Sequence, residues 1–88
     1  MGVFFSNLKI EHIEIDNECL HALPYCIHNV RLQTKDREFT VRLNSCEIVA
    51  ICKLNNLPVS SHFPTYTNFE IARSKITAKR KILRESLY

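Results

Sequence analysis

Two Cys-x-His pairs stand close together in the first third of the chain, Cys19 with His21 and Cys26 with His28. A four-residue turn over 22–25 would place the pairs opposite each other on one side of a hairpin, because alternate residues of a strand share a face. Thiolate and imidazole are the ligands that zinc prefers. Common zinc modules, however, place two to four residues between paired cysteines. We therefore expect no bound metal, and these four residues are the metal-ligand candidates.

The single glycine of the chain, Gly2, follows the initiator methionine, and a hydroxyl residue stands at Ser6. This is the acceptor pattern for N-myristoylation. One acyl chain binds a membrane with an association constant of only about 10⁴ M⁻¹, so stable anchoring needs a second signal such as a basic surface. The alternative is that the apolar residues at 3–5 open a strand and fill the core. Gly2 is therefore the lipidation candidate.

The glycine-poor composition excludes several kinds of active site. With Gly2 alone, the chain cannot build a glycine-rich phosphate loop, a dinucleotide fingerprint or a nucleophile elbow. The pattern of two histidines flanking a glutamate on one helix is absent too. His12 and His62 have no partner suggested by spacing, and Cys52 fits a small buried hydrophobe. We expect a protein that is not an enzyme and has no cofactor.

The positive charge of the chain is concentrated near its C-terminus. The formal net charge is +3, yet the residues from 67 onward carry six basic and two acidic groups, whereas 1–66 are close to neutral. A local excess of cations attracts phosphates or anionic head groups, although it is also common on a solvated helix face. The basic binding candidates are Arg73, Lys75, Lys79, Arg80, Lys81 and Arg84.

Strand periodicity dominates the first half of the chain. Phe39, Val41 and Leu43 alternate with polar residues and give the clearest strand signature. Similar alternation over 8–15 and 25–32 predicts two further strands, with a bulge or bend where the phase slips near His12. The polar stretch 34–37 is short enough for a hairpin. The three strands are expected to form an antiparallel meander.

Helical spacing replaces the alternation after residue 43. Asn44 followed by Glu47 fits a capping box and predicts a helix over 45–54. Asn55 and Asn56 can adopt the left-handed conformation that ends helices. Prolines place 57–66 in a loop.

The segment from 67 or 68 to about 86 is expected to be the longest helix. At about 100° per residue its apolar residues form one stripe, with Arg73, Arg80 and Arg84 on one border and Lys75 and Lys79 on the other. Basic stems can cover apolar surface while their charged heads stay in water. The stripe suits docking on the chain's own domain, with Phe69 in the core, or docking on another molecule. Its members are Phe69, Ala72, Ile76, Leu83 and Leu87.

These patterns predict an α+β fold, a three-stranded antiparallel meander followed by two helices. Residues 1–88 are expected to form one small domain, strand-rich over 1–44 and helical over 45–88. Charged residues within the first twenty positions argue against a signal peptide, and no run of about eighteen uncharged apolar residues suggests a membrane span. We expect an intracellular, cytoplasmic protein with reduced thiols.

Three classes of binding protein fit these features. The favoured class is a non-catalytic protein-interaction module, such as an inhibitor, adaptor or accessory protein of the kind that viruses and mobile elements encode, acting through a strand edge or the long helix. The alternatives are a nucleic-acid binder using the basic helix and a myristoylated membrane-peripheral protein. Single-strand or base recognition usually adds exposed aromatic or amide groups, and none stands between Arg73 and Arg84. The 45% apolar content leaves a homodimer open.

Overall fold

Three strands and two helices make up the computed structural model, which describes residues 9–16 and 26–86. The strands form one antiparallel sheet in the order β1-β2-β3, and both helices follow it in the chain. The predicted α+β fold, a meander followed by two helices, is confirmed. The strands are β1 (His12–Ile15), β2 (Ile27–Gln33) and β3 (Glu38–Asn44), and the helices are α2 (Ser45–Leu54) and α3 (Asn68–Ser86).

β2 and β3 form the hairpin that the polar stretch 34–37 predicts. The backbone N–H of Thr34 donates to the carbonyl of Arg37 at 2.8 Å, and Leu32 pairs with Phe39. Along β2 every second residue is buried and faces the helices. This alternation is the pattern of a sheet with one face in the core and one in water.

β1 covers only His12–Ile15, so the prediction of a strand over 8–15 is wrong for the described residues 9–11. The chain enters β1 through a bulge. The N–H of Glu11 donates to the carbonyl of Gln33 at 2.8 Å, while His12 is the register partner of the same Gln33. Two residues thus oppose one, which defines a β-bulge. The extra residue lets Ile10 and Ile13 both face the core although they stand three positions apart.

α2 begins and ends as its sequence predicts. The side chain of Asn44 accepts from the N–H of Glu47 at 2.8 Å, and the Glu47 carboxylate accepts from the N–H of Asn44 at 2.9 Å, a complete capping box. After the helix, Asn56 is left-handed with φ 57°. Asn55 Oδ1 accepts from the N–H of Ile10 at 3.1 Å, which ties the chain before β1 to the end of α2.

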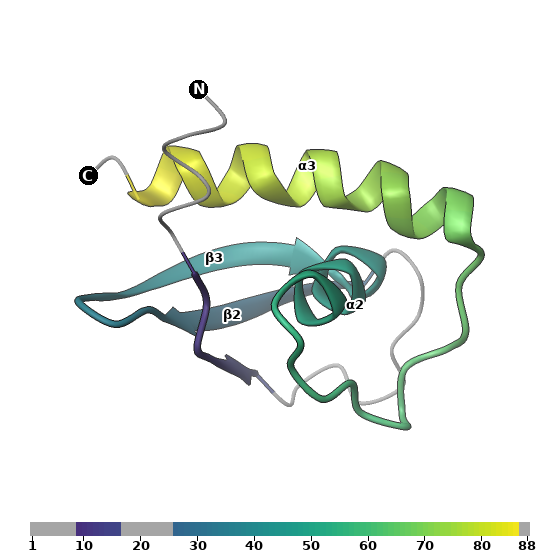
Figure 1. The fold of residues 1–88 in the computed structure, drawn as a ribbon, viewed down its shortest axis with the longest axis horizontal. Helices are drawn as coiled ribbons and strands as arrows, with labels where there is room; N and C mark the ends of the chain where they lie inside the picture. The colour runs from purple at the N-terminus through teal and green to yellow at the C-terminus, as the bar shows by residue number, and fades with distance from the viewer. Residues whose placement is uncertain (1–8, 17–25, 87–88) are drawn as a thin grey trace.

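The two helices contact each other, and both pack against the sheet. Figure 1 shows α3 running along the side of β3 that faces away from β2. The opposite face of the sheet is polar, and on it Arg31 pairs with Glu14 at 3.2 Å and with Glu38 at 3.8 Å. The main core cluster comprises Ile10, Val30, Leu32, Val41, Leu43, Ile48, Ile51, Cys52, Ala78 and Ile82.

Candidate interaction surface

One face of α3 holds the helix on the rest of the protein. Its residues Ile71, Ala78 and Ile82 are buried, and their spacing of seven and four positions places them on one side of the helix. Ala78 and Ile82 join the main core, whereas Ile71 packs in a smaller cluster with Val49 and Ala50 of α2. This face has no apolar surface left for a partner.

A second capping box fixes the start of α3. Thr67 Oγ1 accepts from the N–H of Glu70 at 3.1 Å, and Glu70 Oε1 accepts from the N–H of Thr67 at 3.0 Å. The threonine hydroxyl also donates to Glu70 Oε1 at 2.9 Å. The bonds from the Thr67 N–H and hydroxyl are made to the ionised carboxylate, so they lower the pKa of Glu70.

A buried carboxylate fixes the rotation of α3 against α2. The side chain of Glu47 is only 2% exposed, and its Oε1 accepts from Lys81 Nζ at 2.7 Å. Its Oε2 accepts from the hydroxyl of Thr77. A buried charge is stable only when it is paired and hydrogen-bonded, so this carboxylate keeps Thr77 and Lys81 turned toward α2. The sequence suggested the capping role of Glu47 but gave no signal of its contacts with α3.

The apolar stripe that the sequence predicts on α3 is present but lies on the outside. Phe69 is 74% exposed and Ile76 is 56% exposed. Ala72 is also exposed, and Leu83 is half-buried. The expectation that Phe69 belongs to the core is therefore wrong. Phe69 and the buried Ala78 stand nine positions apart, about two and a half helical turns, so they face opposite ways.

Three arginines border this outward stripe. Arg73, Arg80 and Arg84 are exposed, and none of them forms an ion pair within the described part of the chain. Their spacing places them along one ridge beside Phe69 and Ile76. These five residues make up what we term the outward face of α3. Exposed apolar groups beside arginines are the composition expected of a protein-binding surface.

The lysines of α3 are less available than the arginines. Lys81 lies against Glu47 and so contributes to the contact between the two helices. Lys75 and Lys79 are half-buried on the other border of the stripe. Of the six basic candidates, the three arginines therefore offer the most accessible charge.

Of the predicted metal ligands, only Cys26 and His28 fall within the described residues, and Cys19 and His21 lie outside them. Cys26 is disulfide-bonded, so the expectation of reduced thiols is wrong for this residue. A thiolate, not a disulfide sulfur, is the metal ligand. Across 9–16 and 26–86 no three Cys, His, Asp or Glu side chains gather as a metal site would need. The lipidation candidate Gly2 also lies outside the described residues.

His28 instead makes contacts in the core. Its Nε2 lies 3.2 Å from Ser45 Oγ, and its ring packs edge-on against Phe63. A hydroxyl beside an imidazole is the pairing that nucleophilic catalysis uses. Here Ser45 is fully buried and His28 is only 4% exposed, so a substrate has no access to the pair. Seventeen positions separate the two residues, which is why their spacing gave no signal.

The other two described cysteines, Cys46 and Cys52, are free thiols, both buried. Burial raises the pKa of the Cys52 thiol to about 11, which agrees with its predicted role as a small core residue.

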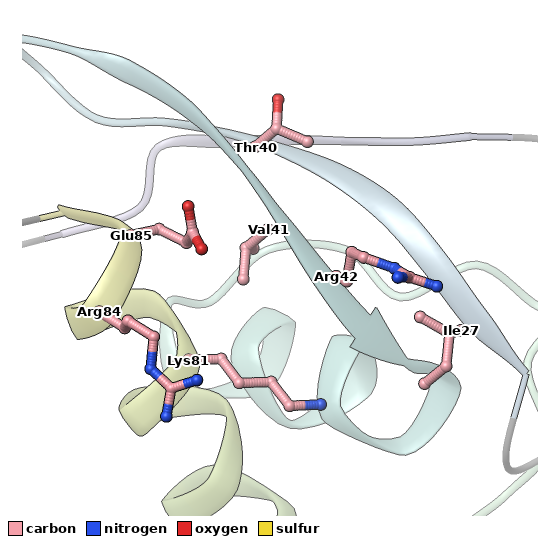
Figure 2. Close-up of a pocket in the computed structure, with 7 residues that line it drawn as sticks. All are labelled: Ile27, Thr40, Val41, Arg42, Lys81, Arg84 and Glu85. Atoms are coloured by element: carbon pink, nitrogen blue, oxygen red, sulfur yellow. The ribbon is translucent and has the colours of Figure 1, made fainter. Parts of the chain in front are cut away.

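A hollow of about 600 Å³ lies between β3 and the last turns of α3. Figure 2 shows that the strand contributes Thr40, Val41 and Arg42. The remaining lining residues are Ile27 from β2 and Lys81, Arg84 and Glu85 from α3.

No protein-family model, no curated protein and no solved structure matches the chain. In the part of the chain that the structure describes, no helix combines the length and the apolar character needed to span a membrane. The fold and the surface define a small α+β protein that presents one helix face carrying apolar side chains and arginines. Its function is therefore inferred from this geometry.

Proposed function

We propose that this protein is a non-catalytic interaction module, an inhibitor, adaptor or accessory protein that binds a partner protein through the outward face of α3. The exposure of Phe69 and Ile76 carries the proposal. Both are large apolar side chains on a helix whose opposite face already binds the core. A partner would remove their apolar area from water, which is worth about 25 cal/mol for each Å² buried.

The arginines indicate the chemistry of that partner. Arg73 and Arg80 flank the exposed apolar groups and have no ion pair among the described residues. Arginine and aromatic residues are enriched among the residues that dominate binding energy. The matching surface on the partner is an apolar groove with acidic groups at its rim.

A comparison of variants tests the proposal. The full chain and its Phe69→Ala/Ile76→Ala variant serve as baits in the native host, and the affinity of any recovered protein is then measured with purified components. We expect the double variant to lose at least about tenfold in affinity, because two exposed anchors are removed. Since neither side chain enters the core, its thermal unfolding should stay close to that of the wild type.

Val59→Ala is the matched control, because Val59 is an exposed apolar residue of the loop before α3, 38% accessible. Partners should bind this control as they bind the wild type. Partners that bind all three proteins equally well would show that the outward face of α3 is not the interface.

A second candidate function rests on the same helix. The ridge of Arg73, Arg80 and Arg84 is exposed and could contact successive phosphates of a nucleic acid. The apolar groups beside the ridge have no role in phosphate contact, and for this reason we rank nucleic-acid binding second. Acylation of Gly2, with the basic helix as a second membrane signal, stays a prediction from the sequence.

A further inference from the structure

β3 leaves one edge of the sheet unpaired. The hairpin bond from Thr34 to Arg37 sets the pattern, and every second residue after Arg37 exchanges backbone hydrogen bonds with β2. The backbone groups of Glu38, Thr40 and Arg42 therefore point to the other side of the strand. No backbone partner of these three residues appears within the described part of the chain.

The two edges of the sheet differ in their protection. β1 has four residues and a bulge at its entrance, both of which hinder pairing with another strand. β3 has seven residues, no proline and a continuous register with β2. A long, regular edge is a ready template for an added strand.

The hollow beside β3 provides space for such a strand. Figure 2 shows β3 on one side of the hollow and the last turns of α3 on the other, with Glu85 directed toward Val41. Apolar surface comes from Val41 and from Ile27, which is 44% exposed. Arg42 contributes a cation from the strand, and Arg84 contributes one from the helix.

We propose that this groove binds an extended segment of a partner protein, which adds to β3 as a fourth strand and carries acidic side chains. Backbone hydrogen bonds from Thr40 and Arg42 would give affinity, as in other cases of strand addition. The hollow is lined by two arginines and by one carboxylate, Glu85, while its lysine, Lys81, is paired with Glu47. The remaining positive charge selects acidic residues in the segment. This site shares Arg84 with the outward face of α3, but its other lining residues lie outside that face. The proposal does not depend on partner binding through Phe69 and Ile76.

A single strand fits the groove better than a second copy of the chain does. α3 contacts β3 and runs along its outer side (Figure 1). Two copies paired through β3 would bring a second α3 and α2 into the same region. An isolated extended segment needs only the space of the hollow between β3 and the last turns of α3.

A proline substitution tests the groove. Thr40→Pro removes an outward N–H and places a ring at the edge, a change that edge strands tolerate because that N–H is not part of the sheet. Glu38→Pro makes the same change on the same edge, outside the hollow. The probe is a displayed library of random heptapeptides, selected on the full chain, and hydrogen exchange verifies that both variants keep the sheet.

We expect enriched peptides to contain Asp or Glu among β-branched residues. They should bind Thr40→Pro at least about tenfold more weakly than wild type, and Glu38→Pro almost normally. Selection on Arg42→Glu should lose the acidic preference, and bound peptide should protect the amides of Thr40 and Arg42 from exchange. The proposal would be overturned if the library showed no enrichment or if the peptides bound both proline variants equally well. It would also be overturned if the wild type were a dimer that Thr40→Pro dissociates.

Discussion

At the scale of single residues, Glu47 joins two parts of the fold. Its carboxylate caps α2 through the N–H of Asn44 and also accepts from Thr77 and Lys81 of α3. The sequence predicted the first contact, because a capping box is local and has a fixed spacing. The second joins residues thirty and thirty-four positions apart, and no local pattern encodes it.

Replacing this carboxylate should loosen α3. We expect Glu47→Ala to lower the free energy of unfolding by about 2–4 kcal/mol, since the change removes one helix cap and two hydrogen bonds to a buried charge. Urea denaturation followed by circular dichroism measures the loss. Glu85→Ala, an exposed acid near the end of α3, is the control and should change stability by less than about 0.5 kcal/mol. Similar losses in the two variants would mean that Glu47 does not hold the helices together.

At the scale of elements, local rules predicted the bounds of α2 and the turn between β2 and β3, whereas the start of β1 at His12 was not predicted. The capping box at Asn44, the left-handed Asn56 and the hairpin over 34–37 were all found as predicted. Each depends on residues within a few positions of one another. Helical spacing of apolar residues predicted a helix from 67 or 68 to about 86, and α3 covers Asn68–Ser86.

The orientation of α3 could not be predicted in the same way. The helix has two apolar stripes, and the sequence favours the one with the larger side chains, Phe69 and Ile76. The protein buries the other, which includes the small Ala78. Ala78 lets α3 approach the core closely, while Thr77 and Lys81 reach Glu47 from the neighbouring positions. Periodicity predicted only the first stripe, and it could not identify the buried one because that choice depends on contacts with α2.

The start of α3 should respond to acid. Hydrogen bonds from Thr67 lower the pKa of Glu70 below its ordinary value of 4.5. A carboxyl with a lowered pKa stabilises the fold fully above its ordinary value, and that contribution is lost as pH falls through the lowered pKa. We expect amide exchange over residues 68–71 in the wild type to accelerate as the pH falls below 4.5 and through the lowered pKa of Glu70.

Glu70→Gln isolates this effect, because the amide keeps the shape of the side chain but does not titrate in this range. At neutral pH, the amides of residues 68–71 should exchange faster in this variant than in the wild type. After the exchange rates are corrected for the intrinsic pH dependence of amide exchange, acidification should not accelerate them further in the variant. If wild type and variant showed the same acid response, the capping box would not be its source.

At the scale of the whole molecule, charge is balanced on the sheet and unbalanced on α3. Arg31 lies between Glu14 and Glu38 on the polar face of the sheet. The arginines of the α3 ridge have no such counterparts among the described residues. The protein therefore presents a one-sided positive field, which can guide either an acidic protein or a nucleic acid toward the helix.

Salt and charge reversal distinguish these two partners. If α3 contacts phosphates, Arg73, Arg80 and Arg84 act together. A plot of the logarithm of the binding constant for duplex DNA against the logarithm of the salt concentration then has a slope of about −0.9 for each phosphate neutralised. For a protein partner, changing all three to glutamate chiefly slows association, whereas Phe69→Ala speeds dissociation because it removes an apolar anchor. We expect the second pattern in surface plasmon resonance with the recovered partner. The alternative result is micromolar, salt-sensitive binding to DNA duplexes of unrelated sequence. If the triple glutamate variant abolished that binding and Phe69→Ala left it intact, α3 would be a nucleic-acid-binding surface.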